Sequence, residues 1–589
     1  MKDFLKYTLA TITGIILASI LMFVVLLASL SAIVASGDKT VSITDNSILV
    51  LNAGVQIPDR GTDNPLSGID FTDMSFTPNV GLNEILRNIE KAAADDKIKG
   101  ILIENGQMPS GWATTGEIRK ALMGFRDSGK FVISYSDISL TQECYYLATA
   151  ADRIYISPGS TVDFKGLSSQ VMFFKNALDK LGIDVQVIRH GKFKGAVEPF
   201  MLDRLSEENR DQIRDYTGSI WKHVIDEISD SRNIPSERLN QLADNLTGYL
   251  SSKAAEDGLV DGVLFRDELI DTLKTLSGID KSKDLKLVTM TKYSKVPDPA
   301  SIYSTKNRIA VIYAEGNIVA GKGNETNIGG KHYAEVIRKI RLDTAVKAIV
   351  LRVNSPGGNA LPSDEIWREL TLAEQVKPLV ISMGNYAASG GYYISCPATK
   401  IFADPETISG SIGVFGLIPN AESLLEKKFG LTTETVNTNA NADFPSLIRP
   451  MTNFENEVLQ MSIERTYSDF VSKVAAGRNM KTEEVDNIGQ GRVWSGKRAA
   501  EIGLVDEMGG LMDAIKKAAE LAGTEKYKIR ELPELEDPYT RLFEQLSGEV
   551  KMKFIRKELG ESFIHYKRFT ELKDLTGIQT RLPYFIDIR

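Results

Sequence analysis

The second half of this 589-residue chain repeats the pattern of the first half. The segment 131–134 (Phe-Val-Ile-Ser) aligns with 379–382 (Leu-Val-Ile-Ser), and 145–147 (Tyr-Tyr-Leu) aligns with 392–394 (Tyr-Tyr-Ile). The offset is 248 residues for the first pair and 247 for the second. Such sustained self-similarity marks a duplicated domain. It also gives an internal control, because residues that the fold needs should occur in both copies, whereas residues that chemistry needs can occur in one.

Each copy alternates short apolar runs with helical stretches, which is typical of buried parallel strands joined by helices. The corresponding runs lie at 47–51 and 308–312, at 100–103 and 348–351, and at 131–134 and 379–382. Each copy ends in a related helix–turn motif, 252–261 and 496–506, where a glycine follows a short helix. The pattern predicts an α/β protein with two tandem domains, each built from right-handed β-α-β units.

These alignments set the expected domain boundaries. The first repeat spans 39–280, a polar linker spans 281–306, and the second repeat spans 307–525. The repeat is lost in the tail, 526–589, where apolar and charged residues alternate at helical spacing between Tyr539 and Leu572. We therefore expect a helical tail that either covers a core face or packs on a partner subunit in an oligomer.

The N-terminus carries 31 consecutive residues without a charge, from Tyr7 to Gly37. A bilayer needs about 20 such residues, whereas the apolar region of a cleaved signal peptide has about 7–15. Lys2 and Lys6 precede the run. By the positive-inside rule, residues 1–38 form an uncleaved signal anchor with its N-terminus in the cytoplasm. The sequence therefore predicts a single-pass protein of the cytoplasmic membrane, bound to the lipid bilayer, with its folded part on the periplasmic side.

Composition excludes several other classes of protein. The net charge of −8, without a dense basic block, argues against nucleic-acid binding. The chain has only four histidines and two cysteines, and it lacks the Cys-x-x-Cys and His-Glu-x-x-His spacings of metal sites. We therefore expect no metal and no cofactor. Cys144 and Cys396 fall near equivalent points of the two copies, where two buried small side chains are a simpler interpretation than a disulfide.

Ser389 occurs in a Gly-rich turn of the second copy only, opposite Thr141 or Gln142 in the first. The turn follows an apolar strand and opens a helix, where the dipole and free N–H groups favour a developing negative charge. The small residues around it, Gly390 included, leave room for the backbone of a substrate. Close helix packing would also explain Ala-Ser-Gly-Gly, so this segment alone does not establish a nucleophile.

A second glycine motif, Pro356-Gly357-Gly358, is also confined to the second copy. Consecutive glycines expose backbone N–H groups, which is what an oxyanion hole requires. We therefore expect Gly357 and Gly358 to bind a developing oxyanion, although a plain loop accounts for the same residues.

Lys194 lies in an extended, glycine-flanked segment of the first copy, opposite Ala442 in the second. A lysine can act as a general base when burial lowers its pKa from about 10.4 towards neutrality. A solvated surface charge is the alternative for Lys194 and for its neighbour Lys192. His190 is a rival base, but the sequence offers it no evident Asp partner.

Four motifs together resemble the signal peptide peptidase A (protease IV) family, a serine–lysine dyad family, in its long duplicated form. They are Lys194–Phe200, Asn354–Gly358, Ala387–Tyr392 and Ser409–Gly413, in this order, and the resemblance covers roughly residues 1–525. It implies a crotonase/ClpP-like fold in each half, with Ser389 as the nucleophile and Lys194 as the general base. It also implies peptide substrates, above all cleaved signal peptides, and a homotetramer. Gly195 departs from the family, where a serine is frequent at this position.

The sequence therefore predicts a membrane-anchored serine endopeptidase that forms an acyl-enzyme and needs no cofactor. Gly357, Gly358, Gly390 and Ser411 would bind the substrate and its oxyanion. Two other classes remain open. A crotonase-type enzyme acting on an acyl-CoA would reveal itself by bound CoA or a cytoplasmic location, whereas an inactive scaffold would be expected to lose Ser389 or Lys194.

Overall fold

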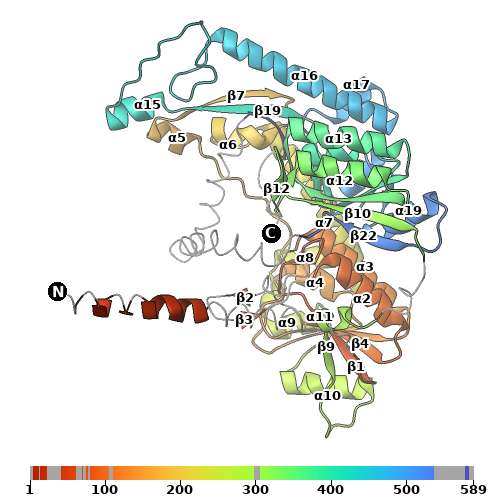
Figure 1. Cartoon of the computed structure of the whole chain (residues 1–589). Helices are drawn as coiled ribbons and strands as arrows, with labels where there is room; N and C mark the ends of the chain where they lie inside the picture. The colour runs from red at the N-terminus through yellow and green to blue at the C-terminus, as the bar shows by residue number, and fades with distance from the viewer. Residues whose placement is uncertain are drawn as a thin grey trace.

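A computed structural model describes the greater part of the chain. The described residues are 4, 6–8, 10–11, 13–22, 42–61, 69–70, 75–76, 80–104, 106, 110–297, 305–324, 326–535 and 577–582. Figure 1 shows the two halves stacked on each other. A projecting arm lies beside the second half and is formed by residues 175–190 of the first half and 414–450 of the second.

The first half is built on a sheet of six parallel strands in the order β8-β6-β5-β4-β1-β9. Its central strands are the predicted apolar runs, and Ile48, Leu102 and Ile133 on them are fully or almost fully buried. The strands are β1 (Ser47–Asn52), β4 (Ile98–Glu104), β5 (Phe131–Ser136), β6 (Arg153–Ile156), β8 (Gly262–Val263) and β9 (Leu287–Thr289). The helices of this half are α2 (Leu82–Ala94), α3 (Trp112–Arg126), α4 (Gln142–Ala148), α5 (Lys175–Leu181), α6 (Glu198–Met201), α7 (Glu207–Arg232), α8 (Ser236–Asp244), α9 (Ser251–Glu256), α10 (Arg266–Ser277) and α11 (Met290–Ser294).

The second half repeats this arrangement in a sheet of eight strands. Six form the order β20-β18-β16-β14-β10-β22, and β17 and β21 pair beside β16. The strands are β10 (Arg308–Glu315), β14 (Val346–Ser355), β16 (Leu379–Ala388), β17 (Lys400–Ala403), β18 (Ile408–Gly410), β20 (Val493–Ser495), β21 (Glu507–Met508) and β22 (Lys528–Leu532). The helices are α12 (Gly330–Leu342), α13 (Ala360–Glu374), α14 (Gly390–Ser395), α15 (Glu422–Leu424), α16 (Asn453–Arg478), α17 (Thr482–Ile488), α18 (Gly496–Glu501) and α19 (Leu511–Leu521).

The structure contains the repeat that the sequence predicts. The parallel pair β1·β4 corresponds to β10·β14, and the added parallel strand β9 corresponds to β22. The long helices α7 and α16 have 26 residues each. Both copies also end in a short helix followed by a left-handed glycine, Gly258 with φ 77° and Gly503 with φ 82°. The predicted mixed α/β architecture of two repeats is therefore confirmed.

A third sheet joins the halves, in the order β12-β13-β11-β15-β23-β19-β7. Its strand β7 comes from the first half and pairs antiparallel with β19 of the second half, from Val414 opposite His190 to Asn420 opposite Asp184. The strands of this sheet are β7 (Asp184–His190), β11 (Asn317–Val319), β12 (Gly323–Asn324), β13 (Asn327–Gly329), β15 (Gly357–Asn359), β19 (Val414–Asn420) and β23 (Gly577–Arg581). In the chain, β7 ends shortly before Lys194, whereas β15 precedes Ser389 and β19 follows it. The sheet therefore holds the segments next to Lys194 and Ser389 together. A separate two-stranded ribbon pairs β2 (Ile69–Asp70) with β3 (Ser75–Phe76).

A buried ionic cluster also joins the halves. The Arg352 guanidinium on β14 is fully buried and lies 2.8 Å from Asp59 Oδ1 and 2.6 Å from Glu117 Oε1, both from the first half. It also donates to Ser382 Oγ at 2.8 Å. Because a buried charge needs a partner, this cluster ties the position of one half to that of the other.

Some sequence predictions concern residues that the structure describes only in part. The described part of 4–22 is helical, and no helix among the described residues is long and apolar enough to cross a membrane. Of the predicted anchor, residues 23–38 lie outside the described residues, as does the tail from 536 to 576. Cys144 and Cys396 are free thiols, and both are buried as expected.

Candidate active site

Lys194 reaches the interior through a tight turn after β7. Gly191 makes this turn with a left-handed φ of 94°, and the N–H of Phe193 donates to the carbonyl of Gln490 at 3.1 Å. Lys194 follows and has no exposed surface. The alternative interpretation of Lys194 as a solvated surface charge is therefore wrong, whereas its neighbour Lys192 is exposed.

Ser389 lies between the end of β16 and the start of α14. Its φ of 54° is in the left-handed region, which is uncommon for a residue with a side chain and is found at strained functional turns. The Ser389 N–H donates to the carbonyl of Gly410 at 2.8 Å, and this bond fixes the turn against β18. Ser389 is fully buried.

The two residues predicted from different copies meet side chain to side chain. Lys194 Nζ lies 2.8 Å from Ser389 Oγ, and it also lies 3.1 Å from the carbonyl oxygen and 3.0 Å from Oγ of Ser411. A neutral amine has two N–H bonds and one lone pair, so it can donate to both oxygens of Ser411 and accept the Ser389 hydroxyl proton. This arrangement is the one that a general base and its nucleophile require.

The electrostatic setting of Lys194 favours the neutral amine. Burial lowers the pKa of Lys194 well below its usual value of 10.5, because the interior penalises the ammonium form. Among the described residues, no carboxylate forms an ion pair with Lys194 that would oppose this effect. A substantial fraction of neutral amine near neutral pH is what deprotonation of a serine by lysine needs.

Residues that the sequence did not single out hold this geometry. Gln212 on α7 donates to the carbonyl of Phe193 at 3.0 Å and accepts from the N–H of Val493 at 3.1 Å, so it links the lysine turn to β20. Next to Val493, the carbonyl of Arg492 accepts from the N–H of Ser411 at 2.6 Å. Gln212 therefore links the turn that carries Lys194 to the strand segment that holds the backbone of Ser411. Its position on a long polar helix gives no sequence signal of this role.

Gly357, Gly358 and Gly390 lie close to the serine. The φ of Gly357 is 104°, and a Cβ on it would stand 2.8 Å from the nitrogen of Gly390. The N–H of Gly357 donates to Ser355 Oγ at 3.1 Å. A Cβ on Gly358 would stand 2.1 Å from the carbonyl oxygen of Ile318, so this position also requires glycine. The structure thus brings the predicted glycines together beside Ser389, with no room for side chains.

His190, the rival base, is engaged elsewhere. Its Nδ1 lies 2.6 Å from Glu464 Oε2, and its ring stacks on Tyr467 with centroids 3.7 Å apart. These contacts anchor the end of β7 to α16. The structure therefore gives His190 a structural role in aligning the strand that leads to Lys194.

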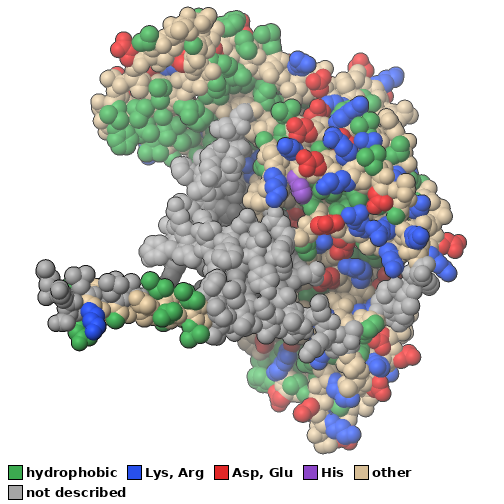
Figure 2. Space-filling model, viewed as in Figure 1, with side chains coloured by type: hydrophobic (Ala, Val, Ile, Leu, Met, Phe, Trp, Pro, Cys, Tyr) green, Lys and Arg blue, Asp and Glu red, His purple; other side chains and the backbone are tan. Residues whose placement is uncertain are grey.

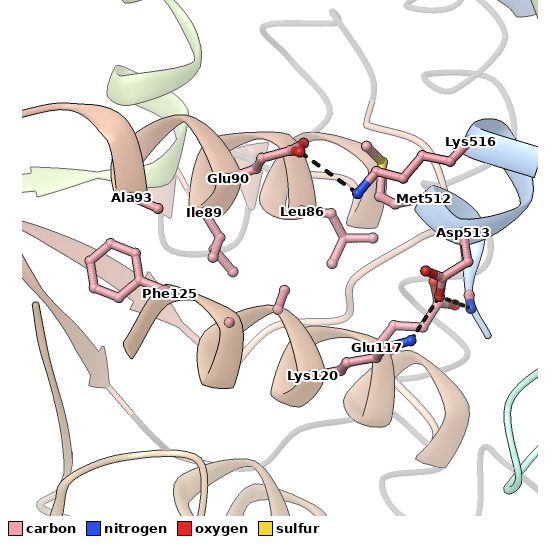
Figure 3. A pocket seen from close by; sticks show the side chains of 13 residues that line it. Leu86, Ile89, Glu90, Ala93, Glu117, Lys120, Phe125, Met512, Asp513 and Lys516 are labelled. Carbon is pink, nitrogen blue, oxygen red and sulfur yellow. Dashed lines mark hydrogen bonds and ion pairs between the residues drawn. The ribbon is translucent and has the colours of Figure 1, made fainter. Parts of the chain in front are cut away.

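A separate groove of about 310 Å³ opens between α2 and α3 of the first half and α19 of the second. Figure 3 shows its apolar floor and the ion pairs that cross its rim, Lys120 with Asp513 and Lys516 with Glu90. Neither Lys194 nor Ser389 lines this groove. It marks the junction of the two halves and does not belong to the serine–lysine site.

Comparison with known proteins identifies one peptidase family in both halves of the chain. The family described as Peptidase family S49 matches residues 124–280 and 371–525, one match in each half. Protease 4 of Haemophilus influenzae is 35% identical over 523 residues, which cover 85% of this chain and 83% of the relative. Serine protease SPPA, chloroplastic, of Arabidopsis thaliana is 34% identical, with 86% of this chain and 75% of the relative covered.

Two further similar proteins match a smaller part of this chain. A putative signal peptide peptidase SppA of Enterococcus faecium is 38% identical over 225 residues, which cover 36% of this chain and 65% of the relative. Among solved structures, a ClpP1 mutant of Listeria monocytogenes is similar at a TM-score of 0.24 and 15% identity, over 35% of this chain and 94% of that one. A TM-score of this size does not bear on the fold.

Proposed function

Since this chain belongs to peptidase family S49 and is a serine endopeptidase, we propose that it cleaves peptides through a dyad of Ser389 and Lys194. The observation that carries the proposal is the distance of 2.8 Å between Lys194 Nζ and Ser389 Oγ, in an interior that disfavours the ammonium form. The two residues lie 195 positions apart in the chain, so this contact is not a by-product of local folding.

The proposed reaction has two stages. Neutral Lys194 accepts the hydroxyl proton of Ser389 while Oγ attacks the scissile carbonyl carbon, and the resulting ammonium then protonates the leaving amine. The peptide C–N bond breaks and an acyl-enzyme on Ser389 remains. Lys194, neutral again, takes a proton from water while the water oxygen attacks the ester carbon. The bond from that carbon to Ser389 Oγ breaks, the ammonium returns the proton to Oγ, and the second product leaves as an acid. Ser411 supports both stages, because its two oxygens accept from the ammonium whenever Lys194 is charged.

We assign the oxyanion site to the glycines beside Ser389. Gly357 and Gly358 follow the strand β14, and Gly390 opens α14 directly after the nucleophile. Backbone N–H groups in this position stabilise the negative charge of a tetrahedral intermediate without a metal. Because the N–H of Gly357 is directed at Ser355 Oγ, a substrate oxygen has to displace that hydroxyl to use this donor.

The proposed substrates are cleaved signal peptides and other hydrophobic peptides. The resemblance of the motifs to signal peptide peptidase A supports this class, as does the name of the Enterococcus faecium relative. The small residues around Ser389 favour an extended chain with small or apolar side chains. The uncharged run of 31 residues supports an N-terminal anchor in the cytoplasmic membrane, with the catalytic halves on the periplasmic side, close to such peptides.

We also propose that the chain assembles into a homotetramer through its projecting arm. Figure 2 shows hydrophobic side chains gathered on the lower face of this arm. Exposed members of the arm include Leu181, Phe429, Leu431 and Val436, the last with 92% of its surface exposed. Large exposed apolar patches on soluble domains mark interaction surfaces, and a second copy of the same arm has matching chemistry.

Hydrolysis of a fluorogenic apolar peptide by the detergent-solubilised full chain tests the proposed function. Wild type, Ser389→Ala, Lys194→Met and the exposed control Lys192→Met are compared, with circular dichroism to verify folding. We expect activity in wild type and Lys192→Met, and a loss of about 10³-fold or more in the other two. Equal activity in all four proteins would refute the dyad.

A further inference from the structure

A strand from the C-terminal end of the chain fills the gap between two strands of the active-site half. The strand β23 pairs antiparallel with β15, where Gly357, Gly358 and Asn359 lie opposite Arg581, Thr580 and Gln579. On its other edge β23 pairs antiparallel with β19. Without this segment, the facing edges of β15 and β19 would have no partner, because β23 is the strand that separates them in the sheet.

The contacts of this strand are those of a tightly bound peptide. Thr580 is fully buried, and its Oγ1 donates to the carbonyl of Gly358 at 3.1 Å. The N–H of Leu582 donates to the carbonyl of Pro356 at 2.7 Å, and Leu582 is 4% exposed. Main-chain pairing on both edges, with buried side chains between, is how an extended peptide binds by strand addition.

The strand lies against the residues that flank the nucleophile. A Cβ on Gly390 would stand 3.0 Å from Thr580 Oγ1, and a Cβ on Gly357 would stand 2.2 Å from the carbonyl oxygen of Thr580. Gly390 follows Ser389 directly, and Gly357 belongs to the proposed oxyanion site. The segment therefore occupies the space next to Ser389 that a peptide must enter before it can be cleaved.

We propose that residues 577–582 are a built-in ligand of the substrate slot, and that this segment inhibits the peptidase until a substrate strand displaces it. The proposal rests on the proposed function and names a regulatory partner for the same site, a segment of this chain. A tethered ligand acts at a high effective concentration, of the order of millimolar. Short peptides compete poorly with it, whereas long apolar peptides that pair with both β15 and β19 compete well.

The test compares two truncated chains. Truncation after Thr576 removes the strand, and truncation after Leu582 removes the residues beyond it but keeps the strand. With a short fluorogenic peptide, we expect the Thr576 truncation to raise kcat/KM about tenfold or more over wild type, and the Leu582 truncation to leave it unchanged. The full-length variant Thr580→Arg should also raise kcat/KM, because an arginine does not fit the buried position against Gly390. If the Thr576 truncation fails to fold, the Thr580→Arg variant tests by itself whether the strand inhibits the peptidase.

A binding measurement separates failure of this inference from failure of the proposed function. A fluorescent peptide with the sequence of residues 577–582 is titrated onto Ser389→Ala proteins, with fluorescence anisotropy as the readout. We expect it to bind the Thr576 truncation at least about tenfold more tightly than the full-length chain. Peptidase activity that is equal in all forms, with equal peptide binding, would overturn the inference and leave the dyad intact. Absence of activity in every form that contains Ser389 would refute the proposed function. The ratio of the two peptide affinities would then still show whether residues 577–582 occupy the slot.

Discussion

Gly491 of the second half packs directly against Lys194 of the first half. A Cβ on Gly491 would stand 2.7 Å from the Cα of Lys194, which is closer than real Cβ atoms approach a backbone. The φ of Gly491 is 83°, so a side chain there would also be strained. The position of the lysine thus depends on the absence of a side chain in the other half.

The variant Gly491→Ala should therefore displace Lys194 from Ser389. A shift of about 1 Å in a catalytic group can lower the rate about 10²-fold, and we expect a loss of this size in kcat. The matched control is Gly278→Ala, where φ is 70° but no atom lies within 4 Å of the added Cβ. It carries the backbone strain without the clash. If the two variants had equal kcat, the contact between Gly491 and Lys194 would not matter for catalysis.

The pH dependence of kcat/KM should report the ionisation of Lys194. The amine acts only when neutral, so activity should rise with pH through the folded pKa of Lys194, which burial places well below 10.5. The variant Ser411→Ala removes a hydroxyl that accepts from Nζ at 3.0 Å. Because hydrogen bonds to a charged group are the stronger ones, the ammonium loses more than the amine. The acidic limb should therefore move to lower pH.

The control for this shift is Ser409→Ala. Ser409 is also buried, but its hydroxyl donates to the carbonyl of Ala387 at 2.9 Å. We expect an acidic limb at the wild-type pH in this variant. A limb that moves upward in Ser411→Ala would mean that the hydroxyl stabilises the neutral amine instead.

The comparison of the two copies explains which parts of the fold and of this site can be predicted from the sequence. The apolar runs that became β4, β5, β14 and β16 were predicted, because buried parallel strands carry their signal locally. Ser389 and Lys194 stood out because each occurs in one copy only. The structure then placed their side chains in contact.

Other features could not be predicted, because they depend on partners far away in the sequence. The bond between Gln212 and Val493 joins residues 281 positions apart, and neither residue type is unusual in its local setting. The sequence predicts substrate binding for Ser411 and gives no sign that both of its oxygens lie within hydrogen-bond distance of Lys194 Nζ. The pairing of β23 with β15 was not foreseen either, because the six residues 577–582 carry no pattern that selects one sheet edge over another.

Lys194 should lower the stability of the protein, and this effect depends on pH. Its folded pKa lies below the unfolded value of about 10.4, so between these two values the unfolded chain binds more protons. Stability therefore rises with pH across this window, by about 1.4 kcal/mol per pH unit for this one group. Lys194→Met removes the dependence, so the variant should melt at a higher temperature than wild type near pH 8.

The gap in melting temperature between Lys194→Met and wild type should close as the pH approaches about 10. Differential scanning calorimetry on the two proteins measures it. The exposed control Lys192→Met should show no gap at either pH. A gap that is constant with pH would mean that the methionine stabilises through packing and that Lys194 has the same pKa in both states.

The cluster of Arg352 should dominate the coupling between the two halves. In Arg352→Met the carboxylates of Asp59 and Glu117 would stay buried without a counter-charge, with side-chain exposures of 1% and 3%. Removing one partner of a buried ion pair destabilises by about 3–5 kcal/mol. Burial already raises the pKa of Glu117, and the Arg352 guanidinium opposes this effect. Loss of the guanidinium therefore disfavours the Glu117 carboxylate further.

A triple variant separates charge from packing at this cluster. Arg352→Met combined with Asp59→Asn and Glu117→Gln replaces the guanidinium and its two carboxylate partners by neutral groups. We expect it to recover most of the lost melting temperature, because neutral groups cost less to bury. The exposed pair of Lys175 and Asp179, 2.6 Å apart on α5, is the control, and its loss should leave the melting temperature almost unchanged because solvent screens an exposed ion pair. If the triple variant were as unstable as Arg352→Met alone, the packing of the Arg352 side chain and its hydrogen bond to Ser382 within the second half, and not its charge, would account for the lost stability.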